Sequence, residues 1–243
     1  MSNTQQQLVS LSGYFAEKPP MAIALSGGVD SMTLAIVAHR ANANTQMFHA
    51  ISPAVPVQAT ARVKQYAELE GWHLHIINAG EMFDEAYIAN PANRCYFCKT
   101  NLYDTVTHAT DLQVASGTNL DDLGDYRPGL IAAEEHQVCH PYVDLQIDKA
   151  SLRLIAGALD FTDLQDLPAA PCLSSRVTTG IAIDAALLPV INEVEQALST
   201  MLAGHLSLQG VRCRIRPGSV ALQIESPEPL DLQATFFLDS IAF

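Results

Sequence analysis

The segment MAIALSGGVDSMTLAIVAHR, residues 21–40, decides the fold. Its first five residues are uniformly apolar, as in a parallel strand that is buried on both faces. A turn with two glycines follows at 26–31, and beyond it Leu34, Val37 and Ala38 recur at helical spacing. The segment therefore predicts a strand, a tight turn and a helix, which together form the first unit of an α/β domain.

The alternation of short apolar strands and amphipathic helices continues to about residue 160. It predicts an α/β fold in which helices cover both faces of a parallel sheet. Residues 79–100 form no regular pattern, and we expect the next helix only over 102–109. The strands are expected at 21–25, 47–52, 73–78, 112–116 and 138–143.

Beyond residue 176 the pattern changes. One helical stripe covers 184–202, and two strands with alternating side chains follow it, at 211–216 and 220–224. We therefore expect two domains, a larger α/β domain over 1–176 and a smaller α+β domain over 177–243.

The composition excludes some classes of protein. The chain of 243 residues is 49% hydrophobic and carries a formal net charge of -13. An acidic surface repels phosphate backbones, which argues against a general nucleic-acid binder. No apolar run reaches bilayer length and the N-terminus lacks a secretory pattern, so we expect a cytoplasmic protein without a membrane partner. In a reducing compartment its five cysteines are expected to be metal ligands, catalytic groups or core residues rather than disulfides.

The turn after the first strand has the chemistry of a phosphate site. Glycines let backbone N–H groups turn toward an anion, and the start of a helix adds unpaired donors and partial positive charge. Serine hydroxyls can bind phosphate, and Asp30 is expected to bind the Mg²⁺ that accompanies ATP. The alternative is a serine-capped turn that binds nothing. The expected nucleotide-binding residues are Ser26, Gly27, Gly28, Val29, Asp30 and Ser31.

Three cysteines are candidate metal ligands. Cys95 and Cys98 form a CxxC pair, and Cys172 lies in a later loop. A CxxC pair can also be a redox pair, a zinc pair or a chance occurrence. Zinc usually takes four ligands, so a histidine would have to join these three. Cys139 and Cys213 lie in strand-like runs and are expected in the core.

Charged residues gather in a loop after the fourth expected strand. Such loops lie at the edge of the sheet where α/β proteins bind ligands. Its carboxylates could hold Mg²⁺, its arginine could bind phosphate, and the backbone of Gly117 could approach the nucleotide. The alternative is a solvated acidic loop. The charged residues are Asp121, Asp122, Asp125 and Arg127.

Arginines in the last third of the chain are candidate anion-binding residues. Arg176 lies four residues after Cys172. Arg212, Arg214 and Arg216 share one face of an expected strand, where they could bind a phosphate or pair with surface carboxylates.

The string SGGVDS after a strand resembles the PP-loop of the ATP pyrophosphatase family. Members of that family cleave ATP between the α and β phosphates and adenylate a carboxylate or carbonyl oxygen. The resemblance implies a turn that stabilises the leaving pyrophosphate, while Mg²⁺ neutralises the developing charge.

A larger set of strings resembles one branch of that family, the LarE sulfur transferases. The resemblance implies a PP-loop domain before a smaller C-terminal domain, with ATP as a cosubstrate. It also implies adenylation of the carboxylates of a pyridinium mononucleotide and their conversion to thiocarboxylates, for a nickel-pincer cofactor. The strings span about residues 20–225: SGGVDS (26–31), RCYFCK (94–99), SGTNLDDLGDYRPG (116–129), PCLSSR (171–176) and VRCR (211–214).

The resemblance also implies roles for single residues. Some members of the branch give up the sulfur of one of their own cysteines, which becomes dehydroalanine. Others hold a 4Fe–4S cluster on three cysteines and pass on an extra sulfide from a sulfur donor. The three-cysteine pattern here resembles the second group, with Cys95, Cys98 and Cys172 as ligands and Cys172 also catalytic. The members are commonly homo-oligomers. Glu195, Arg212 and Arg214 resemble the substrate-site residues of the branch.

Other functions remain open at this point. A PP-loop enzyme of tRNA thiolation can use a three-cysteine cluster, but it must hold a polyanion, which the net charge of -13 opposes. An ammonia-using, amide-forming synthetase would not need the cysteines. A nucleotide-binding sensor without catalysis is a further alternative.

Overall fold

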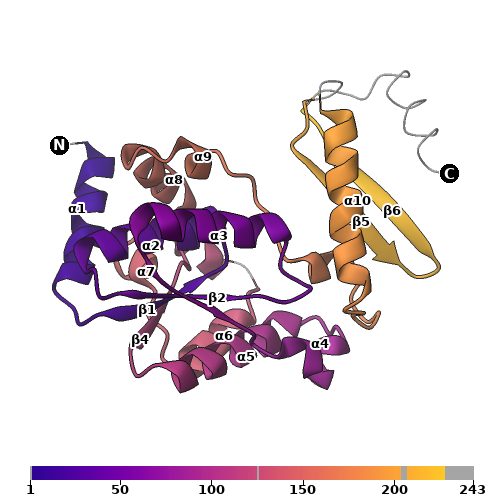
Figure 1. Cartoon of the computed structure of the whole chain (residues 1–243), viewed down its shortest axis with the longest axis horizontal. Helices are drawn as coiled ribbons and strands as arrows, with labels where there is room; N and C mark the ends of the chain where they lie inside the picture. Colours follow the sequence, from indigo (N-terminus) through magenta and orange to yellow (C-terminus); the bar gives the residue numbers. More distant parts are fainter. Residues whose placement is uncertain (1, 125, 204–206, 228–243) are drawn as a thin grey trace.

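A computed structural model describes residues 2–124, 126–203 and 207–227 of the chain. Its centre is a four-stranded sheet in the order β3-β2-β1-β4 (Figure 1). Each neighbouring pair in this sheet is parallel, which confirms the predicted α/β sheet. The strands are β1 (Met21–Leu25), β2 (Gln46–Ala50), β3 (His73–Ile77) and β4 (Gln113–Ser116).

Helices cover both faces of the sheet (Figure 1). Ile23 and Leu25 of β1 pack into one core, while Ala22 and Ala24 belong to the core on the opposite face. Successive side chains of a strand point to opposite faces, so the uniformly apolar β1 has to be buried on both. The first face carries α1 (Asn3–Ala16), α2 (Val29–Ala41), α3 (Val57–Glu70), α8 (Lys149–Ala158) and α9 (Thr162–Gln165), and the second carries α5 (Arg94–Ala109) and α6 (Gly129–Glu135).

The order of the strands creates a crevice at the carboxyl end of β1. The chain places β2 and β3 on one side of β1 and β4 on the other. Where the strand order reverses, the loops that leave adjacent strands turn to opposite faces and separate at the carboxyl edge of the sheet. The turn 26–31 after β1 and the segment that follows β4 therefore lie at the place where this architecture binds ligands.

Two local predictions were wrong. The fifth strand expected in the parallel sheet is not formed, because 138–143 contributes only an isolated bridge between Cys139 and Ala115 before α7 (Pro141–Asp144) begins. Proline has no N–H for a ladder but suits the first turn of a helix. Helix α5 starts at Arg94 rather than near 102, so the CxxC pair lies in its first turns. Within this helix the hydroxyl of Thr100 donates to the carbonyl of Tyr96, one turn earlier, at 3.0 Å, so this polar side chain is satisfied locally.

Helix α10 and the hairpin after it form a separate layer beside the sheet domain (Figure 1). Helix α10 (Leu187–Leu202) packs against the antiparallel hairpin of β5 (Gly210–Arg216) and β6 (Ser219–Glu225). Cys213 is buried there, as predicted. The same core includes Ala54 after β2, Tyr87 of α4 (Glu85–Ile88) and Leu173 of η3 (Leu173–Arg176). The hairpin unit is thus anchored on loops at the carboxyl edge of the sheet.

None of the helices in the described part of the chain has the length and apolar character needed to cross a bilayer.

Asn90 joins the two parts of the molecule. It is fully buried, and its amide donates to the carbonyls of Val177 (3.3 Å), Thr178 (3.0 Å) and Ile181 (2.8 Å). Replacing Asn90 with alanine removes all three bonds, and among the described residues only the Thr178 carbonyl keeps another donor, the Ile181 N–H. We therefore expect the free energy of unfolding to fall by about 2–4 kcal/mol. Urea denaturation measures this loss. The exposed Asn44→Ala is the control and should change stability by less than about 0.5 kcal/mol; equal effects of the two variants would contradict the linking role of Asn90.

Candidate functional site

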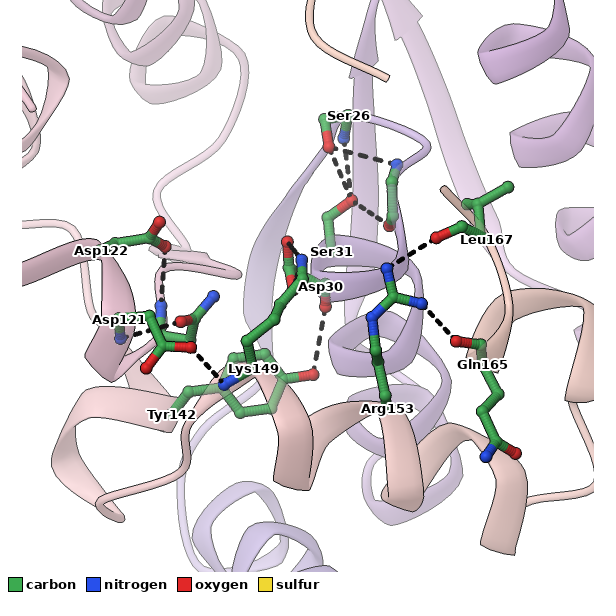
Figure 2. A network of polar contacts seen from close by, with 12 residues as sticks. Ser26, Asp30, Ser31, Asp121, Asp122, Tyr142, Lys149, Arg153, Gln165 and Leu167 are labelled. Carbon is green, nitrogen blue, oxygen red and sulfur yellow. Dashed lines mark hydrogen bonds and ion pairs between the residues drawn. The ribbon is translucent and has the colours of Figure 1, made fainter. Parts of the chain in front are cut away.

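The turn between β1 and α2 is closed by two serine hydroxyls (Figure 2). The Ser31 hydroxyl accepts from the Ser26 backbone N–H at 3.1 Å and donates to the Gly28 carbonyl at 3.2 Å. The two hydroxyl oxygens are 3.0 Å apart. Gly28 is the residue before α2 and provides no side-chain cap. The first amides of this 13-residue helix are therefore without a side-chain acceptor, and such amides attract anions.

Two glycines let the backbone come close to this turn. Gly27 has φ of +80°, and a Cβ there would lie 2.8 Å from the carbonyl oxygen of Ala59. A Cβ on Gly117, which follows β4, would lie 2.8 Å from the Ser31 backbone nitrogen. The side chain of any larger residue at either position would therefore collide with the neighbouring backbone. The turn thus depends on glycine at both positions, while the expected approach of Gly117 to a nucleotide stays a prediction.

Asp30 is held by a lysine that sequence reasoning missed. The Lys149 ammonium lies 2.5 Å from both carboxylate oxygens of Asp30, and the Lys149 backbone N–H donates to Asp121 at 3.1 Å (Figure 2). Burial raises the pKa of Asp30, and the Lys149 ammonium opposes that rise. The Tyr142 hydroxyl also donates to the Asp30 carbonyl at 3.1 Å. Oxygen donors suit Mg²⁺, so a metal would replace or join this ammonium at Asp30.

A cavity of about 280 Å³ opens beside the turn. Ser26, Gly27 and Gly28 contribute to its wall, together with residues from the carboxyl ends of β1 and β2. The cysteines predicted as ligands, Cys95, Cys98 and Cys172, line the same cavity. The fold therefore brings residues of the phosphate-like turn and three thiols, from segments about 70 and 145 residues away along the chain, to one small-molecule-sized space.

The charges in this cavity differ from those of the whole protein. Its wall includes Arg62, Arg94 and Lys99 but, among the described residues, only one carboxylate, that of Glu81. The chain as a whole has a net charge of -13. A positive cavity in an acidic protein favours a small anion over a long polyanion, because the outer surface repels the latter.

The three thiols influence one another. Burial raises the pKa of Cys98 to about 12, against the effect of Lys99, and the neighbouring Cys172 and Cys95 add to the rise. Protein that surrounds Cys172 raises its pKa too, although its side chain is accessible from the cavity. Among the described residues, no group of three histidine, cysteine or acidic side chains lies close enough together to hold a metal ion. The thiols share a cavity as soft donors, without a preformed ligand geometry.

Other predicted residues are bound elsewhere. The Arg176 guanidinium forms two 2.9 Å bonds with the Glu195 carboxylate, and Glu195 also accepts from the Cys213 backbone N–H at 2.8 Å. Both side chains are buried, and neither lines the cavity. Their arrangement is that of a structural pair between η3 and α10.

The hairpin arginines are also engaged. Arg212 pairs with Glu225, as in the alternative of surface pairing. Arg214 donates to the side chain of Gln223 at 2.7 Å and to the Ser175 carbonyl at 3.4 Å. In the loop after β4, Arg127 forms an ion pair with Asp122 at 2.9 Å. Asp125 lies outside the described residues.

Several residues of the site belong to no recognisable sequence motif. Arg62 projects from the middle of α3 and donates to the Gly27 carbonyl at 2.6 Å. Arg153 of α8 donates to the carbonyls of Gln165 and Leu167, so it holds the segment that leads to Cys172 (Figure 2). Glu81 follows β3 at the carboxyl edge of the sheet, and this position is the one signal that could have drawn attention to it.

Comparison with known proteins places the chain among relatives without a described activity. It is 38% identical over 196 residues to the uncharacterized protein slr1717 of Synechocystis sp., which covers 79% of this chain and 73% of that protein. It is 28% identical over 211 residues to the uncharacterized protein MJ0830 of Methanocaldococcus jannaschii, covering 84% and 80% of the two chains. No family model matches the chain.

The reactivity of Cys98 tests the geometry of the cavity. The thiolate is the reactive form, and with a pKa raised to about 12 little of it exists at pH 8. We expect iodoacetamide to alkylate Cys98 at least about tenfold more slowly than free cysteine at pH 8, with a rate that still rises above pH 9. Peptide mapping by mass spectrometry follows the rate. The variant Lys99→Met removes the charge that favours the thiolate and should slow the reaction further; a rate equal to that of free cysteine would contradict the burial of this thiol.

Proposed function

Since the chain belongs to the same family as the uncharacterized Synechocystis protein slr1717, whose name gives no activity, we propose a function from the site itself: an ATP-dependent sulfur transferase of the LarE type. One observation carries the proposal. The uncapped start of α2 and the cysteines Cys95, Cys98 and Cys172 meet at one cavity. A nucleotide bound at the turn would have its α-phosphate near the thiols, as activation followed by sulfur transfer requires.

The first step is adenylation of a substrate carboxylate. A carboxylate oxygen of a pyridinium mononucleotide attacks the α-phosphorus of ATP, and the bond from that phosphorus to the oxygen that bridges to the β-phosphate breaks. The products are an acyl-adenylate and pyrophosphate. The start of α2, whose first amides have no side-chain cap, and the Arg62 guanidinium beside the turn would stabilise the leaving pyrophosphate, since they provide donors and positive charge where negative charge grows.

Mg²⁺ fits this step through the oxygen donors at the start of α2. Asp30 would bind the ion, which would neutralise charge on the phosphates. Lys149 already neutralises Asp30 and keeps it oriented toward α8. When the Asp30 carboxylate binds the metal, the Lys149 ammonium would be free to bind a phosphate oxygen instead.

The second step replaces AMP with sulfur. A sulfide attacks the acyl carbon, a carbon–sulfur bond forms, the bond to the AMP oxygen breaks, and the products are a thiocarboxylate and AMP. Three soft thiolate donors fit a 4Fe–4S cluster, which Cys95, Cys98 and Cys172 would hold and which would supply the sulfide from the iron without a protein ligand. Arg94 and Lys99 line the cavity and can orient the substrate anion, a position that Arg212 and Arg214 do not share.

Pyrophosphate release tests the first step. Anaerobically purified protein should release pyrophosphate from ATP only when the pyridinium mononucleotide is present. Gly117→Ala places a Cβ 2.8 Å from the Ser31 nitrogen and should lower this rate at least about tenfold, because it shifts the start of α2. Gly124→Ala is the matched control, since a Cβ there meets nothing within 4 Å. Release that is independent of the mononucleotide, or that yields an amide with ammonium, would refute sulfur transfer.

Cys172→Ser separates the two steps. The substitution keeps a small polar side chain at the cavity but removes one thiol, so adenylation and pyrophosphate release should stay within about threefold of the wild-type rate. Thiocarboxylate formation, followed by mass spectrometry, should fall at least about 100-fold, because no complete set of three thiols remains. Iron analysis of the same preparations gives an independent measure, with iron in the wild type and little in the variant. Wild-type thiocarboxylate yield from C172S would contradict the role of the cysteines.

A further inference from the structure

Glu81 is a buried carboxylate without a compensating partner. It lies in η1 (Glu81–Phe83), four residues after β3, with only 5% of its surface exposed. Its Oε2 atom is sealed from water and accepts no hydrogen bond. A buried charge of this kind opposes folding unless a partner compensates it, so proteins seldom keep one without a use.

The surroundings of Glu81 point to the cavity. Glu81 lines it and lies close enough to Cys98 and Tyr87 to raise the pKa of each, in addition to the larger effect of burial. The cationic residues of the same wall are Arg62, Arg94 and Lys99. In the described part of the chain, the Oε2 atom of Glu81 has no hydrogen-bond partner, although Glu81 and these three cations line one small space. The cavity therefore presents several positive groups and one negative charge near the thiols.

This distribution of charge selects a ligand of mixed sign. An anion alone would leave the Glu81 charge unbalanced and would be repelled by it. A ligand with phosphate or carboxylate groups and one cationic ring would balance all four side chains, because its ring charge could lie near the carboxylate in an environment of low dielectric. The ring needs no hydrogen-bond donor for this, because its attraction to the carboxylate is electrostatic and acts without direct contact.

We propose that Glu81 is the counter-ion for a cationic aromatic ring in the substrate, so that the cavity prefers mononucleotides whose base carries a positive charge. The inference rests on the proposed function, which already places a pyridinium ring beside the cysteines. It adds a residue that selects the charge of the ring, apart from the residues that bind the phosphates.

Two mononucleotides isolate the charge of the ring. Nicotinic acid mononucleotide has a cationic ring, and orotidine 5′-monophosphate has a neutral one, whereas both carry a ribose phosphate and one ring carboxylate. Calorimetric titration of the full-length protein gives the ratio of the two dissociation constants. The wild type should bind the cationic nucleotide more tightly, and Glu81→Gln should lower this preference about tenfold or more, since it removes the charge and keeps the shape.

Control variants exclude a general loss of structure. Glu81→Asp keeps the charge and should retain most of the preference. Glu85→Gln removes an exposed charge four residues away and should leave the ratio unchanged. Glu81→Gln should also melt at no lower a temperature than the wild type without ligand, because an uncompensated charge is gone.

Each outcome decides between the inference and the function. An unchanged ratio in Glu81→Gln would overturn the inference and leave the proposed sulfur transfer intact. Failure of the wild type to bind either mononucleotide, with ATP still bound, would remove the substrate class of the proposed function and the inference with it.

Discussion

The hydroxyl of Ser31 organises the candidate site. It accepts from the Ser26 N–H and donates to the Gly28 carbonyl, so it pairs two backbone groups within the turn. The closed turn leaves the first amides of α2 without a side-chain cap. Gly117 packs its backbone against Ser31 from the neighbouring loop, which fixes the start of α2 relative to β4. An anion at this helix terminus would meet donors that need no rearrangement, and fixed donors are the ones that stabilise developing charge.

The positive charge of the cavity comes from which side chains the fold brings to its wall, not from the overall composition of the chain. The chain carries 26 acidic and 13 basic residues, yet basic side chains predominate among the charged residues of the cavity wall. They come from α3 and α5, on opposite faces of the sheet, and meet only because both helices adjoin its carboxyl edge. A local positive field in an acidic molecule can bind a small anion and still repel nucleic acid.

Sequence reasoning succeeded where the signal is local. The apolar β1, the glycine turn and α2 follow from 20 adjacent residues, and the alternation after them predicted the parallel sheet. It failed where a single residue overrides a pattern, as Pro141 does in the expected fifth strand. It could not find Lys149 at Asp30 or the pairing of Arg176 with Glu195, because each partner is remote in sequence and chosen by packing. Glu81 has no motif, and its lack of a partner appears only in three dimensions.

The position of Cys172 depends on both parts of the molecule. On its N-terminal side, Arg153 of α8 binds the Leu167 carbonyl at 2.7 Å. On its C-terminal side, the Leu173 N–H donates to the Ala54 carbonyl at 2.8 Å, and Arg176 ties η3 to α10 through Glu195. The C-terminal unit therefore restrains the segment that carries the thiol, although none of its described residues beyond 176 lines the cavity. In the proposed sulfur transfer, Cys172 would have to stay near the nucleotide and near two other cysteines, and restraint from both sides would keep it there.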